Sequence, residues 1–325
     1  MQLSREDLIR RCNHPHTMYG ARRVTVTDGK GRGQRLIEVK TAGGLRATFM
    51  EDKCLDILDL DYKGVNLAYY TKNGLTDVRH TETDSYLKYW SGGFMFTCGL
   101  RNVGPTCTVD GEFHPFHGRI GMTPAEHVNV KVNEEAITIT GIARETSVFG
   151  HSLEMERTVV IPSFGSEITY RDQVRNLTPE EEHVFMLYHI NFGYPFLSEK
   201  LSVKFPEGEI KGRTPDAEAV KDKHAIFTTP IDGEPERVFF HYPKDEFPKV
   251  LLHNTELGIS AEVEFDKKQL PILTQWKSMR SSDYALGIEP CTNTVKGRAG
   301  ELQDGYDIKV PGFGALDYGV TIKFR

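Results

Sequence analysis

The sequence is dominated by short segments of β-strand character that follow one another with only turns between them. Alternating or β-branched residues mark about fifteen such segments. They are 23–27, 34–40, 46–50, 55–60, 128–132, 136–141, 153–161, 167–174, 183–190, 225–228, 238–241, 250–253, 259–265, 272–276 and 315–324. Turn dipeptides such as Asp28-Gly29 and Asp110-Gly111 separate neighbouring segments, as they do in antiparallel hairpins. Because these intervals leave no room for crossover helices, the pattern predicts an all-β fold, a large antiparallel β-sandwich.

The chain is long enough to bury a large core. Its 325 residues are 38% hydrophobic and 26% charged, which is typical of a folded globular protein. A large all-β fold can use this length as one unit, and no linker rich in Pro, Gly or Ser divides it. We therefore expect a single domain over residues 1–325. A short N-terminal helix is expected at about residues 4–11, where Ser4 and Asp7 form a capping-box pattern.

The charge pattern favours a small-molecule partner. There are 40 basic and 46 acidic residues, a net charge of -6, and no block of Lys or Arg dominates. The electrostatic footprint of a protein that binds nucleic acid or an anionic membrane is therefore missing. The N-terminal residues 1–11 are charged throughout, and no stretch approaches the roughly 18 apolar residues of a membrane span. We expect a cytoplasmic protein; no feature of the sequence predicts its oligomeric state.

Two polar segments interrupt the strand pattern. Residues 206–236 are the most polar part of the chain and are expected to form an insertion or a long hairpin. Residues 77–90 are polar apart from their aromatic side chains and lead into the aromatic, glycine-rich segment 91–99. A polar loop that feeds such a strand is suited to the rim of a cleft.

Three segments far apart in the chain each place a titratable side chain among aromatic residues, glycines and prolines. They carry His117 in 113–119, His189 in 188–193 and Glu289 in 287–290. Two imidazoles and a carboxylate that meet in a cleft would form a general acid/base set. Each residue also has a structural alternative, because buried histidines are commonly hydrogen-bonded core residues and a buried glutamate can belong to a salt bridge.

The segment before the glutamate adds candidates for ligand binding. Trp276 offers a flat aromatic face on which the C–H face of a pyranose could stack, although core packing explains a tryptophan equally well. Lys277 and Arg280 could hold sugar hydroxyls or an anionic substituent, although basic residues on a solvated turn are the commoner case.

Taken together, the motifs resemble those of the aldose 1-epimerase (galactose mutarotase-like) superfamily, in particular its poorly characterised bacterial branch. The resemblance covers nearly the whole chain, and the motifs are specific as a set. They are 42–45, 55–57, 62–64, 116–120 with 123–125, 188–197, 275–277 and 287–293. The resemblance implies a galactose mutarotase-like β-sandwich of the supersandwich type. It also implies an open cleft for a monosaccharide, and neither a metal nor an organic cofactor.

The resemblance assigns roles to individual residues. Glu289 matches the base that removes the proton of the anomeric hydroxyl, and His189 matches the acid that protonates the ring oxygen. His117 matches a histidine that supports the same end of the sugar by hydrogen bonding. Arg101 matches an arginine that binds the hydroxyls of the hexose, and Gln275 falls in the region of that family's substrate-binding aspartate.

The remaining expected substrate-binding residues are Arg119, Asn191, Trp276 and Lys277. The basic side chains of Arg119, Lys277 and Arg280 leave room for an acidic or otherwise modified sugar. The expected activity is therefore the interconversion of the α and β anomers of a monosaccharide by acid/base ring opening, that is, a cofactor-independent isomerase of carbohydrate metabolism.

Two other functions fit the same residues. A metal-dependent sugar isomerase could use His114, His117, His189 and Glu289 as ligands, because imidazoles and a carboxylate suit divalent metals. A protein that binds carbohydrate without turning it over could retain the same fold, because a fold does not determine a function. Metal analysis separates the first alternative from a mutarotase, and an assay of anomer exchange separates the second.

Overall fold

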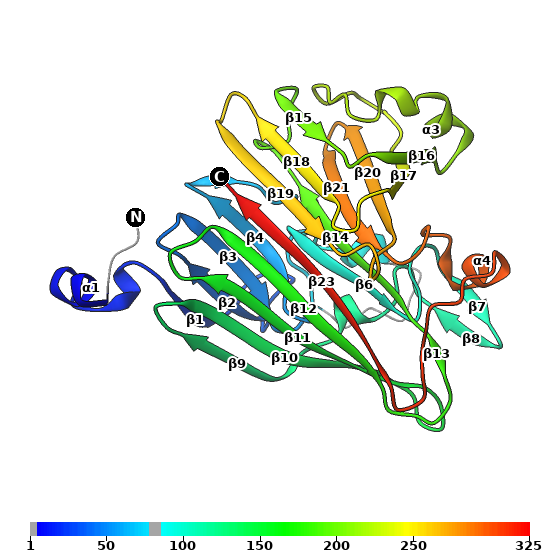
Figure 1. The fold of residues 1–325 in the computed structure, drawn as a ribbon, viewed down its shortest axis with the longest axis horizontal. Helices are drawn as coiled ribbons and strands as arrows, with labels where there is room; N and C mark the ends of the chain where they lie inside the picture. Colours follow the sequence, from blue (N-terminus) through cyan, green and yellow to red (C-terminus); the bar gives the residue numbers. More distant parts are fainter. Residues whose placement is uncertain (1–4, 78–85) are drawn as a thin grey trace.

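Most of the chain folds into three antiparallel sheets (Figure 1). The computed structural model describes residues 5–77 and 86–325. The N-terminal sheet runs in the order β1 (Gly20–Thr25), β2 (Arg35–Lys40), β3 (Leu45–Met50), β4 (Asp56–Tyr62) and β5 (Val65–Asn66). The eight-stranded sheet runs in the order β15 (Leu201–Lys204), β18 (Lys249–Asn254), β19 (Ile259–Phe265), β23 (Ala315–Phe324), β12 (Glu167–Asn176), β11 (Ser152–Pro162), β10 (Ala136–Thr146) and β9 (Glu126–Val132).

The third sheet carries most of the residues singled out by the sequence. It runs in the order β16 (Gly208–Gly212), β17 (Arg237–Pro243), β20 (Ile272–Arg280), β21 (Asp283–Cys291), β14 (Phe185–Phe192) and β6 (Met95–Leu100). Two small pairs, β7 (Cys107–Val109) with β8 (Glu112–His114) and β13 (Glu182–His183) with β22 (Lys309–Val310), complete the strands of the described residues.

The helical segments are short. They are α1 (Arg5–Arg11), η1 (Pro15–Thr17), α2 (Tyr86–Tyr89), η2 (Ile120–Met122), α3 (Pro215–Ala219), η3 (Lys221–Lys223) and α4 (Gly297–Gln303). Figure 1 shows α1 at one end of the molecule and α4 beside the β7–β8 pair at the other. Within residues 5–77 and 86–325, no helix is long and apolar enough to cross a membrane.

The burial patterns identify an outer and an inner layer. In β10, β12 and β23 buried residues alternate with more exposed ones, so one face of the eight-stranded sheet packs inward. Every residue of β6 and β14 is buried, so this part of the six-stranded sheet is covered on both faces. One face contributes to a core shared by all three sheets, and the other supports a second, aromatic cluster around Trp90 and Phe96.

A fully buried arginine connects the three sheets. Arg157 of β11 contacts Asp56 of β4 at 2.7 Å and Asp172 of β12 at 2.6 Å. It also donates to the hydroxyl of Thr97 of β6 at 2.9 Å, and the hydroxyl of Tyr188 of β14 donates to Asp172 at 2.7 Å. A buried guanidinium is stable only with such partners, because an unpaired charge in a core costs several kcal/mol.

The predicted β-sandwich is confirmed, with one strand assigned wrongly. Residues 225–228, expected as a strand, form an irregular loop, because their neighbourhood packs against Lys277 instead of a strand partner. Lys277 donates to the carbonyl of Ile226 and lies over the ring of the buried Phe227. The polar segment 206–236 contains β16, α3 and η3. Of the expected cleft-rim loop 77–90, residues 78–85 lie outside the described residues.

Replacing the buried arginine tests the role of this network. Arg157→Met should lower the free energy of unfolding by about 3–5 kcal/mol, because it leaves two buried carboxylates without their cation. Urea denaturation with an unchanged m value measures this loss. Arg175→Met is the matched control on β12, where the arginine is exposed and pairs with Glu156 at 3.2 Å. The control should lose no more than about 1 kcal/mol. Equal, small losses in both variants would contradict a central role for Arg157.

Candidate active site

The register of two adjacent strands brings His189 and Glu289 together. β14 and β21 are antiparallel, with Ile190 opposite Ile288 and Leu187 opposite Cys291. This register sets His189 opposite Glu289 on the same face of the sheet. The Nε2 atom of His189 lies 3.2 Å from Oε1 of Glu289. Residues 100 positions apart in the sequence are therefore adjacent because of strand pairing.

Alternation along β14 decides which way the histidine points. Met186, Tyr188 and Ile190 belong to the core shared by the three sheets. Phe185 and Leu187 belong to the aromatic cluster on the opposite face. Since successive side chains of a strand point to opposite faces, His189 projects away from the main core and toward that second cluster.

Gly287 leaves the space that the glutamate occupies. A Cβ atom at position 287 would collide with Oε1 of Glu289 and crowd Trp276, which lies opposite on β20. The carboxyl group therefore folds back over the bare Cα of Gly287, beside the tryptophan. A glycine inside a strand commonly marks such a close approach.

His189 and Glu289 line an aromatic pocket of about 250 Å³. The ring of His189 lies 5.5 Å from that of Trp90 and 5.4 Å from that of Trp276. The pocket is lined by Tyr86, Leu87, Trp90, Gly104, Pro105, Phe116, His117, His189, Arg213, Glu236, Val238, Thr274, Trp276, Glu289 and Val295. A concave site with mostly apolar walls and a few convergent polar groups is the usual form of a small-molecule site.

His117 reaches the pocket from a loop with a constrained backbone. It has a left-handed conformation, with φ of 58°, and its backbone N–H donates to the carbonyl of Gly104 at 2.8 Å. The next residue, Gly118, lies so close to the Gly99 carbonyl that a Cβ atom could not fit. The N–H of Gly104 also donates to Nδ1 of His117 at 3.3 Å, which leaves Nε2 as the protonated nitrogen. His117 therefore presents a hydrogen-bond donor.

The central pair is buried and incompletely hydrogen-bonded. His189 is 6% exposed and Glu289 is 2% exposed. Within the described part of the chain, Nδ1 of His189 and Oε1 of Glu289 take no hydrogen bond. Leaving a buried polar group unsatisfied costs about 1–3 kcal/mol, so such atoms commonly mark a functional site.

Burial drives both members of the pair toward their neutral forms. It lowers the pKa of His189 to about 4. Burial, with a smaller contribution from the nearby Glu236, raises the pKa of Glu289 well above its usual range. In the ligand-free pair, burial therefore favours a proton on the carboxyl group over one on the imidazole. The pKa of His117 is lowered well below its usual value by burial, by His189 and by Arg213.

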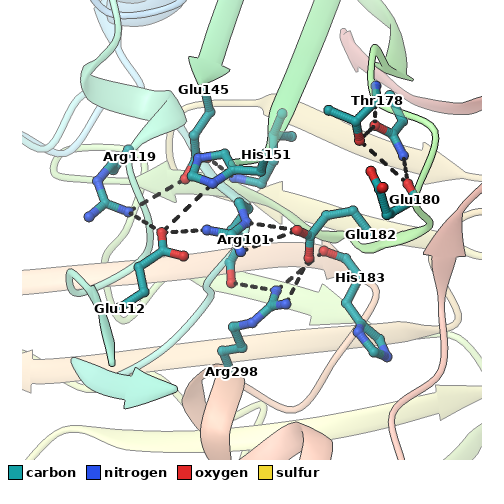
Figure 2. Close-up of polar contacts among 12 residues, drawn as sticks. Arg101, Glu112, Arg119, Glu145, His151, Thr178, Glu180, Glu182, His183 and Arg298 are labelled. Atoms are coloured by element: carbon teal, nitrogen blue, oxygen red, sulfur yellow. Dashed lines mark hydrogen bonds and ion pairs between the residues drawn. The ribbon is translucent and has the colours of Figure 1, made fainter. Parts of the chain in front are cut away.

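The structure places two of the expected substrate-binding arginines outside the pocket lining, in an ion-pair network (Figure 2). Arg101 contacts Glu112 and lies 3.2 Å from Glu182. Arg119 lies 3.6 Å from the buried Glu145. These ion pairs join the β7–β8 pair to β10 and β13, so both guanidinium groups connect elements of the fold.

Strand alternation separates the three neighbours expected to bind substrate on β20. Trp276 lines the pocket, whereas Gln275 and Lys277 do not. The Oε1 atom of Gln275 contacts Nδ1 of His224 at 3.0 Å and Nε2 of His241 at 3.1 Å. The ammonium of Lys277 donates to the carbonyls of Lys223, His224 and Ile226. Gln275 and Lys277 thus anchor the connection between β16 and β17.

Asn191 is buried and does not line the pocket. Its side-chain amide donates to the carbonyl of Gly93 at 3.1 Å and to that of His189 at 3.0 Å. It therefore holds the backbone of β14 beside the start of β6.

Two charged pocket residues were not singled out by the sequence. Arg213 follows β16, and Glu236 precedes β17 and accepts a hydrogen bond from Nε1 of Trp276 at 2.7 Å. Both belong to the polar segment 206–236, in which nothing local distinguishes a pocket residue from a solvated one. Tyr86 and Trp90, which also line the pocket, belong to the polar segment with aromatic residues that the sequence predicted as a cleft rim.

The ligand set of the metal-dependent alternative is not formed. Among residues 5–77 and 86–325, no group of three or more His, Cys, Asp or Glu side chains is placed to hold a metal ion. His117, His189 and Glu289 line the pocket, whereas His114 does not.

The overall architecture matches solved structures at low sequence identity. A candidate aldose 1-epimerase from Klebsiella pneumoniae superposes with a TM-score of 0.86 at 20% identity, covering 95% of this chain and 88% of that one. A galactose mutarotase-like protein from Clostridium acetobutylicum has a TM-score of 0.68 at 13% identity, covering 95% and 99%. A galactose 1-epimerase from Lactobacillus acidophilus has a TM-score of 0.64 at 12% identity, covering 94% and 99%.

These similarities show that the chain has the galactose mutarotase-like β-sandwich fold, which confirms the predicted fold. The chain belongs to the family described as a domain of unknown function, DUF4432, whose profile matches residues 31–323. No curated protein sequence matches it significantly. At these identities the solved structures establish the fold alone.

The buried histidine should resist protonation. Because burial lowers the pKa of His189 to about 4, its imidazole should stay neutral as the pH falls through the usual range and gain a proton only near pH 4. NMR titration of the imidazole signals measures this, with His189→Asn used to assign the resonance. A midpoint near the ordinary histidine value of about 6.5 would show that the site is more hydrated than the structure indicates.

Proposed function

We propose that this protein is an aldose 1-epimerase that interconverts the anomers of a monosaccharide. The observation that carries the proposal is the contact of 3.2 Å between His189 and Glu289 at the base of an aromatic pocket. One group can accept a proton while the other donates one, which is what the opening of a hemiacetal ring requires.

The short separation suits this reaction. The two oxygens that exchange protons during ring opening, the anomeric hydroxyl and the ring oxygen, are bonded to the same carbon. An acid and a base that serve them must therefore be neighbours. The pocket volume of about 250 Å³ suits a ligand of monosaccharide size, and Trp276 and Trp90 supply flat apolar faces for its C–H groups.

The proposed ring opening moves two protons, one to Glu289 and one from His189. Glu289 takes the proton of the anomeric hydroxyl, and the electrons of that O–H bond form the carbonyl at C1. The bond between C1 and the ring oxygen breaks, and the ring oxygen takes a proton from His189. After rotation about the C1–C2 bond, the ring closes on the other face of the carbonyl. The two groups then exchange roles, so the pair regains its starting state.

The protonation of the free pair is compatible with this cycle. The cycle needs one proton on the pair in total, and burial favours the form in which Glu289 carries it. That arrangement is the one expected after ring opening. Movement of the proton to His189 across the 3.2 Å contact produces the arrangement needed to open a ring. His117, which presents its Nε2–H to the pocket, is proposed to hydrogen-bond the same end of the sugar.

Removing either member of the pair should abolish most of the activity. Glu289→Gln and His189→Asn should each lower turnover by about 10²- to 10⁴-fold, because each removes one proton-transfer group. Polarimetry or NMR exchange spectroscopy on a panel of aldoses, deoxy sugars and uronic acids measures the rate. His253→Asn is the control, because this exposed histidine of β18 contacts Ser260 and lies outside the pocket lining.

Sugar binding should survive in Glu289→Gln, which separates catalysis from recognition. If the wild-type protein binds sugars but every anomer equilibrates no faster than in buffer, the protein is a carbohydrate-binding protein on the same fold and the proposal fails.

A methyl group beside the glutamate should impair the reaction without unfolding the protein. Gly287→Ala should lower kcat at least about tenfold, because a displacement of about 1 Å in a catalytic group is sufficient for a large loss. The colliding atom is the end of a side chain, so the melting temperature should change little. Cys291→Ala, further along the same strand, is the control for a small change in volume near the site. Unchanged kcat in Gly287→Ala would show that Glu289 does not need its present position.

A further inference from the structure

Arg213 has a fixed backbone and an exposed side chain at the pocket. Its N–H donates to the carbonyl of Val238 at 2.9 Å, which places it at the end of the β16–β17 pairing. The following residue, Thr214, caps α3 by accepting the N–H of Ala217 at 3.2 Å. The two hydrogen bonds hold the backbone on both sides of Arg213, whose side chain lines the pocket.

The positive charge of Arg213 has no counterion. Within the described residues, its guanidinium makes no hydrogen bond and no ion pair. Among the described residues that line the pocket, it is also the one Lys or Arg side chain. Most arginines near the site are committed elsewhere, as Arg101 is to Glu112 and Glu182. An unpaired guanidinium beside a ligand pocket is available to bind a planar or tetrahedral anion.

The two outer charges of the pocket both influence its buried titratable groups. Arg213 contributes, after burial and His189, to the lowered pKa of His117. Glu236 contributes, after burial, to the raised pKa of Glu289, and its carboxylate is held by the indole N–H of Trp276. Arg213 therefore acts on both His117 and Glu289, whereas the negative charge of Glu236 is fixed beside Trp276.

We propose that the substrate is an aldose that carries an anionic substituent, and that Arg213 binds this substituent in the pocket. This inference rests on the proposed mutarotase function and names its substrate class. A carboxylate or a phosphate ester would supply the same chemistry, two or more oxygens that accept hydrogen bonds from the guanidinium. A neutral sugar would leave the guanidinium without a charged partner.

The three basic residues that first suggested an acidic sugar lie outside the pocket lining. Lys277 is surrounded by backbone carbonyls, Arg119 lies in the ion-pair network, and Arg280 lies 3.9 Å from Asp283. None of these three lines the pocket, whereas Arg213 does.

The test compares matched sugars. Anomer exchange of glucose, glucuronate and glucose 6-phosphate is measured with the wild-type protein and with Arg213→Gln. The wild type should prefer one of the two anionic sugars over glucose, and the preferred one identifies the substituent. In Arg213→Gln the ratio of kcat/KM for that sugar to kcat/KM for glucose should fall about 10- to 100-fold, the loss of a charge-assisted hydrogen-bond pair. Arg280→Gln, an exposed arginine outside the pocket lining, is the control and should leave the ratio unchanged.

A second variant has the opposite expected effect. Glu236→Gln keeps an oxygen for the indole N–H of Trp276 and removes the negative charge, so the same ratio should rise. A wild type that prefers glucose, or a ratio that Arg213→Gln does not change, would overturn the inference while leaving the mutarotase proposal intact. If no sugar is turned over, isothermal titration calorimetry tests anion binding instead. It compares the binding of glucuronate and glucose 6-phosphate by the wild-type protein and by Arg213→Gln. Loss of anion binding in Arg213→Gln supports the inference, and equal binding by both proteins overturns it.

Discussion

The position of β14, the strand that carries His189, depends on one buried guanidinium. Arg157 contacts Asp56 and Asp172, which belong to different sheets, and Asp172 also accepts the hydroxyl of Tyr188 on β14. The arrangement satisfies a charge that would otherwise be too costly to bury, and it fixes β14 relative to the other layers. Because Tyr188 is held on the core face, the next residue, His189, must project to the opposite face. The core network thus contacts one face of β14, and the histidine of the proposed catalytic pair lies on the other face.

The proposed chemistry depends equally on register. His189 and Glu289 meet because β14 and β21 pair with Ile190 opposite Ile288. A slip of one residue would turn the glutamate into the main core, where no partner is prepared for it. The bare Cα of Gly287 then gives the carboxyl group its room. Strand pairing therefore supplies both the contact and the dry surroundings that keep the pair neutral.

Much of this arrangement could be predicted from the sequence, because periodicity and turns are local properties. The all-β fold was predicted in this way, and His117, His189 and Glu289 were selected because each stands among aromatic residues, glycines and prolines. Local pattern could not show that Arg101 would be paired, since its carboxylates are distant in the sequence. Successive side chains of a strand point to opposite faces, so the sequence could have shown that Trp276 and Gln275 do not face the same pocket. Nothing in the sequence distinguished Arg213 from the other basic residues of a polar segment.

The anchoring of the 206–236 segment has an evolutionary consequence. This segment brings Arg213 and Glu236 to the pocket, and its attachment includes hydrogen bonds from Lys277 and Gln275 to backbone carbonyls. Backbone acceptors are present whatever side chains the segment carries. Mutations within it can therefore accumulate without disturbing the strands that hold the acid/base pair. A lineage with this architecture could diversify the sugars it accepts while inheriting its chemistry unchanged.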